Sequence, residues 1–184
     1  MLALFSKGAS PEVWAGAPLR ESAQEFHQVL QQAFANGAII PFRFPTLMKD
    51  EEELTTYMQE NAASYVSSLK TFENSVQMEA VISYSDSLSS ATVKTSGTVY
   101  LRARQKQSEE LQGVADRLRQ CAGEVAKDWR DRSVQNTLRV FTLLDRDSVS
   151  ELKGRLRELS VPVGVTVRIT GPWPVTEFLN LNTT

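Results

Sequence analysis

Two segments near the start of the chain have the apolar spacing of amphipathic helices. In residues 19–36 apolar positions recur every three or four residues, and Asn36-Gly37 supplies a left-handed stop at the end. Residues 50–72 show the same spacing after an acidic run, Asp50 to Glu53, whose carboxylates favour the positive end of a helix dipole. The apolar positions are Ala23, Phe26, Leu30, Ala33 and Phe34 in the first segment, and Leu54, Met58, Ala62, Tyr65, Leu69 and Phe72 in the second.

The second half of the chain predicts two more helices. A long one covers residues 99–130 and carries an apolar stripe that another element must cover. The stripe consists of Leu111, Val114, Leu118, Cys121, Val125 and Trp129. A shorter helix is predicted over 148–159, because Ser148 and Glu151 have the spacing of a capping box.

Four segments have the apolar pattern of β-strands. Residues 76–84 and 163–169 alternate between apolar and polar positions, which is typical of half-buried strands. Residues 38–44 and 138–144 are short apolar runs. Pro41 indicates that the run at 38–44 is an edge strand or contains a bulge, since proline cannot donate to the ladder.

The order of these elements predicts an α+β fold. From residue 38 onward it reads strand, helix, strand, long helix, strand, helix, strand. Without the long helix this is the β-α-β-β-α-β order of a ferredoxin-like sheet. We therefore expect a ferredoxin-like domain over 37–184, with a helical insertion, 99–130, between its second and third strands. We expect residues 1–36 to form a remnant strand and an extra N-terminal helix that pack on this domain.

Composition and charge narrow the class of protein. The chain has 184 residues, 41% of them hydrophobic and 23% charged, as in an ordinary globular protein. Twenty Lys and Arg residues nearly balance 22 Asp and Glu, so nothing indicates a nucleic-acid or anionic-membrane surface. No apolar run approaches the ~20 residues that span a bilayer. The single cysteine, Cys121, excludes an internal disulfide and fits a reducing cytoplasm.

Residues suited to catalysis or metal binding are few. His27 is the single histidine, on a predicted helix, and Cys121 lies on an apolar stripe where a small buried side chain is the simplest interpretation. The acidic run from Asp50 to Glu53 could hold a metal, but adjacent helical side chains fan around the axis and no histidine joins them. No phosphate loop, dinucleotide fingerprint or nucleophile elbow is present. We expect no enzyme, no cofactor and no metal.

The segment ITGPWPV, residues 169–175, ends the last predicted strand in an unusual way. Gly171 lets the backbone turn, and Pro172 and Pro174 stop the ladder. Trp173 is then either a plug that folds over the sheet edge or part of a recognition motif. If its ring is buried, Trp173→Ala is expected to cost ~3–5 kcal/mol.

Two blocks of the chain resemble the GvpF/GvpL family of gas vesicle accessory proteins. VRITGPWPVTEF is similar to the family's C-terminal signature, and HQVLQQAFANGAIIPFRFPTLMKDEEEL to its helix, strand and acidic helix start. The Tyr100-Leu101 pair is also similar to one at the head of the family's long helix. The matching residues are His27, Pro41, Arg43, Phe44, Thr46, the run Asp50 to Glu53, Thr170, Gly171, Pro172, Trp173, Pro174 and Phe178.

The chain also departs from the family pattern. Pro45 stands where the family usually has glycine, and Val175-Thr176-Glu177 replaces the usual Pro-Tyr-Ser. The N-terminal α/β domain of the family is expected to be shortened to a remnant at Leu2 to Phe5.

The resemblance implies a non-enzymatic, cytoplasmic and gas vesicle-associated protein. It implies binding to the hydrophobic gas vesicle shell protein and to other gas vesicle accessory proteins, with no nucleic-acid or membrane partner. The implied interaction residues are Pro41, Arg43, Phe44, Thr46, Gly171, Pro172, Trp173, Pro174 and Phe178. Two alternatives stay open: a shortened relative acting as a general interaction scaffold, and a ligand-binding or enzymatic ferredoxin-like domain.

Overall fold

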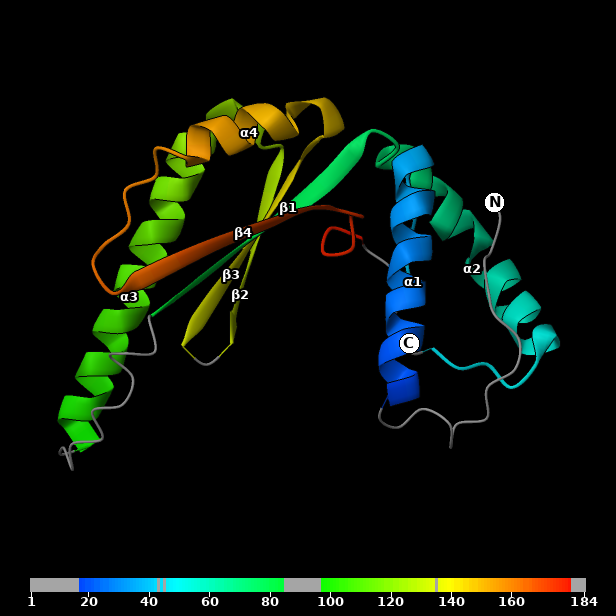
Figure 1. Cartoon of the computed structure of the whole chain (residues 1–184), viewed down its shortest axis with the longest axis horizontal. Coiled ribbons are helices and arrows are strands. Elements are labelled where there is room, and N and C mark those ends of the chain that lie inside the picture. The colour runs from blue at the N-terminus through cyan, green and yellow to red at the C-terminus, as the bar shows by residue number, and fades with distance from the viewer. Residues whose placement is uncertain (1–16, 43, 45, 85–96, 135, 180–184) are drawn as a thin grey trace. The chain divides into compact units, whose positions relative to one another are not determined.

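The computed structural model describes residues 17–42, 44, 46–84, 97–134 and 136–179. The described residues form an α+β fold with four α-helices and a four-stranded antiparallel sheet (Figure 1). They divide into two compact units: residues 17–74 with Leu179, and Ser75–Phe178.

The first unit contains two helices, α1 (Ala17–Asn36) and α2 (Glu51–Thr71). The acidic run begins α2, as predicted: Asp50 is the N-cap, and its Oδ1 accepts a hydrogen bond of 2.9 Å from the backbone N–H of Glu53. Glu53 reaches back in turn, and its Oε2 accepts from the backbone N–H of Lys49 at 2.5 Å. These bonds satisfy N–H groups that a helix start otherwise leaves unpaired.

The predicted strand at 38–44 is wrong. Its described residues belong to no sheet, and Pro41 already removes one of the donors that a strand ladder would need. Aromatic rings dock on the two helices instead: Phe44 lies 5.0 Å from Phe26 of α1, and Phe42 lies 5.9 Å from Tyr57 of α2, measured between ring centroids. The apolar run therefore packs as a loop between helices.

The second unit contains the sheet and two helices. Its elements are β1 (Ser75–Tyr84), α3 (Gly97–Ala122), the 3₁₀ turn η3 (Gly123–Val125), β2 (Asp128–Val134), β3 (Thr137–Asp145), the 3₁₀ turn η4 (Arg146–Ser148), α4 (Val149–Leu156) and β4 (Val165–Trp173). The strands are all antiparallel to their neighbours, in the order β2-β3-β1-β4. In this unit α3 contacts β1, β3 and α4.

The predicted helix over 99–130 is too long. It ends at Ala122, where Gly123 follows with a φ of 56°, the left-handed conformation that closes many helices. Val125 and Trp129 therefore do not belong to its stripe, and Asp128–Val134 forms β2. The sequence pattern did not predict β2, because an exposed edge strand needs no alternation of apolar and polar residues, and DWRDRSV has none.

The ferredoxin-like sheet with an inserted helix is not confirmed. Its predicted first strand is absent. The helix α3 does lie between the predicted strands at 76–84 and 138–144, but the unpredicted strand β2 follows it there. The predicted capping box of α4 is also wrong, because the Ser148 side chain makes no capping bond. Glu151 instead pairs with Arg155 one turn along the helix, at 2.7 Å.

The main core lies between the helices and one face of the sheet. Val76, Met78, Ala80 and Ile82 of β1 point to this face, as their alternation predicts, and each is at most 4% exposed. In the sheet register they lie opposite Leu144, Thr142, Val140 and Leu138 of β3. Leu111, Val114 and Leu118 of α3 and Leu152 of α4 are buried in the same unit. The second face of β1 carries Gln77, Glu79, Val81 and Ser83.

The Asp50 cap gives a test of the first unit. Asp50→Ala removes the acceptor for the Glu53 N–H and should lower the free energy of unfolding by roughly 0.5–2 kcal/mol. Glu52→Ala is the matched control, because Glu52 is exposed in the same helical turn and makes no capping bond. Urea unfolding followed by far-ultraviolet circular dichroism measures both, and equal losses would contradict the cap.

Candidate interaction surface

The second face of the sheet is partly covered by the end of the chain. After β4, residues 174–178 fold back over Gln77, whose side-chain Oε1 accepts hydrogen bonds from the backbone N–H groups of Thr176 and Glu177, both at 3.0 Å. Val175 and Phe178 are each 4% exposed. Gln77 is itself buried, so this amide ties two segments that lie about a hundred residues apart in sequence.

Arginines of β2 hold the same segment from the side. Arg130 donates from Nη1 to the carbonyl oxygen of Glu177 at 2.7 Å, and its guanidinium lies 5.2 Å from the centre of the Phe178 ring. Arg132 forms an ion pair with the Glu177 carboxylate at 2.7 Å. The exposed arginines therefore bury an aromatic ring and fix the returning chain against β2.

The corner between β4 and this segment depends on Gly171. Its φ of 118° is one that side-chain-bearing residues rarely adopt. A Cβ there would lie 2.8 Å from Met78 Sδ and 3.0 Å from the carbonyl oxygen of Gln77. The Gly171–Pro172 peptide bond is cis. Glycine is therefore required both for the backbone conformation and for the close approach to β1.

Trp173 closes the strand beside this corner. It lies opposite Gln77 in the register of β4 and β1, and its Nε1 donates to Thr170 Oγ1 at 3.2 Å. The residue is half-buried. The cost of ~3–5 kcal/mol expected for deleting a fully buried ring therefore does not apply to it. The motif ends β4 and leads the chain back over the sheet, which is the behaviour of a structural plug.

The remaining predicted interaction residues lie in the first unit. Pro41 and Phe44 are half-buried, and Thr46 is exposed. Arg43 and Pro45 lie outside the described residues, as do Leu2 to Phe5. In the second unit Pro172 is exposed and Pro174 half-buried. The structure thus brings Gly171, Pro172, Trp173, Pro174 and Phe178 together at one corner, and Pro41, Phe44 and Thr46 on one loop.

Sequence reasoning missed the residues that hold this surface together: Gln77, Arg130, Arg132 and Glu177. An alternating strand indicates that Gln77 faces away from the core but not that a distant segment covers it. A second ion pair on the same face joins Glu79 and Arg139 at 2.5 Å, and the hydrogen bond that Arg139 Nε donates to Glu79 raises the pKa of Arg139. Arg139 also lies 5.3 Å from the centre of the Phe141 ring.

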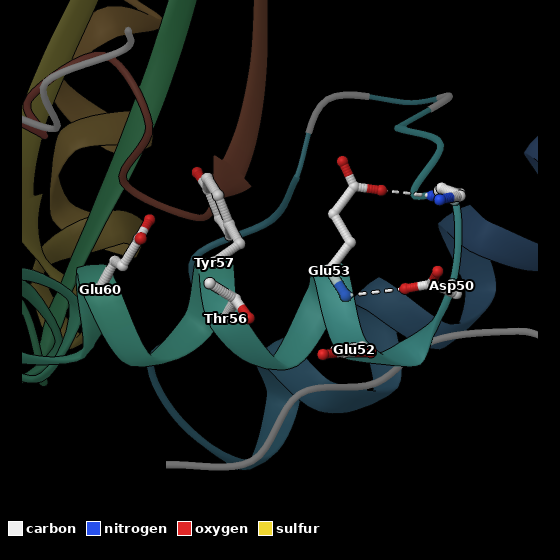
Figure 2. A pocket seen from close by; sticks show the side chains of 7 residues that line it. Asp50, Glu52, Glu53, Thr56, Tyr57 and Glu60 are labelled. Carbon is white, nitrogen blue, oxygen red and sulfur yellow. Dashed lines mark hydrogen bonds between the residues drawn. The ribbon is translucent and has the colours of Figure 1, made fainter.

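An open groove of about 520 Å³ at the start of α2 has no comparable organisation. It is lined by Lys49, Asp50, Glu52, Glu53, Thr56, Tyr57 and Glu60. Figure 2 shows that the Asp50 and Glu53 carboxylates are already used in the helix cap. Among the described residues, no group of three or more His, Cys, Asp or Glu side chains could hold a metal ion.

The two candidate catalytic residues lie on different units. His27 is exposed on α1, where its Nε2 is 2.9 Å from Gln31 Nε2, and Cys121 is half-buried near the end of α3. In the part of the chain that the structure describes, no helix is long and apolar enough to cross a bilayer.

Gly171→Ala tests the corner. The strained backbone alone should cost about 1–3 kcal/mol of unfolding free energy, and the contact with Met78 and Gln77 should add to it. Gly154→Ala is the control: Gly154 lies in α4 with no atom within 4 Å of an added Cβ, so the change should be neutral or stabilising. Thermal unfolding of the two variants measures the difference, and equal melting temperatures would show that the corner tolerates a side chain.

Comparison with known proteins identifies the family. The family model for gas vesicle synthesis protein GvpL/GvpF matches residues 2–180. A search of the curated proteins gives no significant match. Members of the matched family are structural gas vesicle proteins and not enzymes, which confirms the expectation that this chain is not an enzyme.

Two solved structures have a similar fold. The gas vesicle protein GvpF from Anabaena sp. PCC7120 matches with a TM-score of 0.70 at 12% identity, over 94% of this chain and 82% of that one. GvpF from Microcystis aeruginosa matches with a TM-score of 0.63 at 11% identity, over 94% of this chain and 83% of that one. Because the family model spans nearly the whole sequence, this chain belongs to the GvpL/GvpF family of gas vesicle synthesis proteins.

Proposed function

We propose that this protein is a cytoplasmic, gas vesicle-associated accessory protein that binds the hydrophobic shell protein or sister accessory proteins during gas vesicle nucleation and assembly. The family match over residues 2–180 carries the proposal. A shell subunit that polymerises through apolar faces needs a partner to cover them until growth begins. Binding without catalysis is consistent with the surfaces described above.

The motif residues would serve this function in two ways. Exposed positions such as Thr46 and Pro172 are available to a partner. Gly171 and Phe178 would act indirectly, because they set the corner that presents their neighbours. The departures from the family pattern at Val175 and Glu177 do not open the corner, since Val175 is buried and Glu177 binds Gln77 and Arg132.

Co-expression with the major gas vesicle shell protein of the source organism tests the proposal. The shell protein should stay soluble and elute together with this chain in size-exclusion chromatography. An unrelated soluble protein of similar mass, expressed in its place, is the control and should leave the shell protein insoluble.

If the shell protein precipitates while this chain elutes unchanged, binding to the shell protein is wrong. The same experiment with sister accessory proteins then decides between an assembly factor and a scaffold without a vesicle role. Pro172→Ala in the co-expressed chain asks whether the exposed side of the corner contributes, and Gly154→Ala again serves as the control for folding.

A further inference from the structure

The strand β2 is an edge of the sheet. Among the described residues it pairs with β3 along one side, and no strand pairs with its other side. Its residues are exposed except Trp129, which is half-buried, and the Asp131 carboxylate forms an ion pair with Arg119 of α3. Seven residues without glycine or proline are long enough to pair with another extended chain.

The backbone shows which groups face outward. In an antiparallel pair, successive residues point their N–H and C=O groups alternately toward and away from the partner strand. The N–H of Trp129 is bonded by the Asp128 carboxylate, Oδ1 at 2.7 Å, and so is not used by β3. Asp131 and Ser133 follow at intervals of two and therefore also direct their backbone groups to the free side.

The opposite edge differs. There β4 contains Pro172, which has no N–H to donate, and the register of β4 against β1 shifts between Gln77 and Glu79. Lys153 of α4 also lies over that edge, with Nζ 3.4 Å from the carbonyl oxygen of Gly171. The β2 strand has neither a proline nor, among the residues that the structure describes, a covering lysine; its protection consists of charged side chains, which disfavour a chain of like charge but not one of complementary charge.

The charges of β2 disfavour a second copy of this chain. Suppose that the β2 strands of two copies pair antiparallel and that the two sheets keep their core faces on the same side. The centred register then places Asp131 opposite Asp131 and Arg130 opposite Arg132. A shift of two residues in either direction places Arg130 opposite Arg130, or Arg132 opposite Arg132. The centred register and the shift that pairs Arg132 with Arg132 therefore bring only like charges together, which is destabilising. The shift that pairs Arg130 with Arg130 also places Asp128 opposite Arg132 twice, so the dimer test below covers that register.

The second face of β2 instead favours an acidic partner. Arg130 and Arg132 point there together with Asp128, whose carboxylate accepts the Trp129 N–H, and Arg139 of β3 lies directly opposite Arg132. Glu177 and Glu79 neutralise Arg132 and Arg139, whereas Arg130 bonds a carbonyl oxygen and stacks on a ring, with no carboxylate partner among the described residues. An added strand with acidic side chains on this face would supply one.

We propose that the free edge of β2 binds an extended, acidic segment of another protein by antiparallel strand addition. Asp131 and Ser133 provide the backbone hydrogen bonds, and Arg130 selects an acidic side chain on the second face. This goes beyond the proposed function, because the edge recognises a backbone and a charge pattern and does not depend on the shell protein.

A synthetic peptide of alternating glutamate and valine, acetylated and amidated at its ends, tests the edge. Its addition should slow amide hydrogen exchange at Asp131 and Ser133 in the purified chain. The same peptide with lysine in place of glutamate should bind about tenfold more weakly, since cross-strand attractions become repulsions.

Ser133→Pro removes an outward N–H without removing a bond to β3, and should abolish binding of the glutamate peptide. Ser133→Ala keeps the N–H and should bind like the unchanged chain. Circular dichroism checks that both variants fold, and the comparison of the two peptides on the unchanged chain stands whether or not the proline variant does.

Three results would overturn the inference. The first is equal binding of the glutamate and lysine peptides, and the second is no protection at Asp131 and Ser133. The third is a dimer of the chain in analytical ultracentrifugation that Ser133→Pro dissociates, because the edge would then belong to a second copy. Neither result bears on whether the shell protein binds elsewhere.

Discussion

The buried amide of Gln77 is the contact on which the second face of the sheet depends. A carboxamide removed from water costs about 1–3 kcal/mol when its partners are missing, so the two N–H groups of residues 176 and 177 are required as well as favourable. They reach Gln77 because the chain reverses after β4. The reversal in turn requires Gly171, whose backbone packs against Met78 and Gln77 where no side chain fits. Sheet, corner and chain end therefore form one cooperative arrangement.

The charged side chains on the second face of the sheet are paired in a way that accommodates the returning segment. Arg132 and Arg139 lie opposite each other on neighbouring strands, an unfavourable pair by itself. Glu177 from the chain end and Glu79 from β1 each bind one of them. Partly exposed ion pairs of this kind contribute roughly 0–1 kcal/mol each. Their main effect is to define where the returning chain lies.

The two halves of the family signature thus have different physical roles. The glycine and the buried phenylalanine build the corner, while the exposed proline and the partly exposed tryptophan lie where another protein can reach them. In the centred register β2 would present like charges to its own copy, which disfavours that pairing and not pairing with a chain of complementary charge.

The sequence by itself determined the elements whose period and ends are encoded locally. The acidic start of α2 contains its own cap in Asp50 and Glu53, and the alternation from Val76 to Ile82 identified the buried face of β1. The C-terminal signature identified the family, because its glycine and prolines stand at fixed positions.

Only the tertiary structure decided which segments pair and what covers them. The apolar run at 38–44 was predicted as a strand, but no partner strand lies beside it and its rings pack on helices. Trp129 continues the apolar spacing of the preceding helix by coincidence. Residues 128–134 form a strand because they pair antiparallel with β3. Gln77 is polar on an alternating strand, which indicates solvent, yet a segment about a hundred residues away buries it. The local spacing of apolar residues indicates whether a segment is a helix or a strand. Strand pairing and burial depend on contacts between residues far apart in the chain, and no local pattern encodes those contacts.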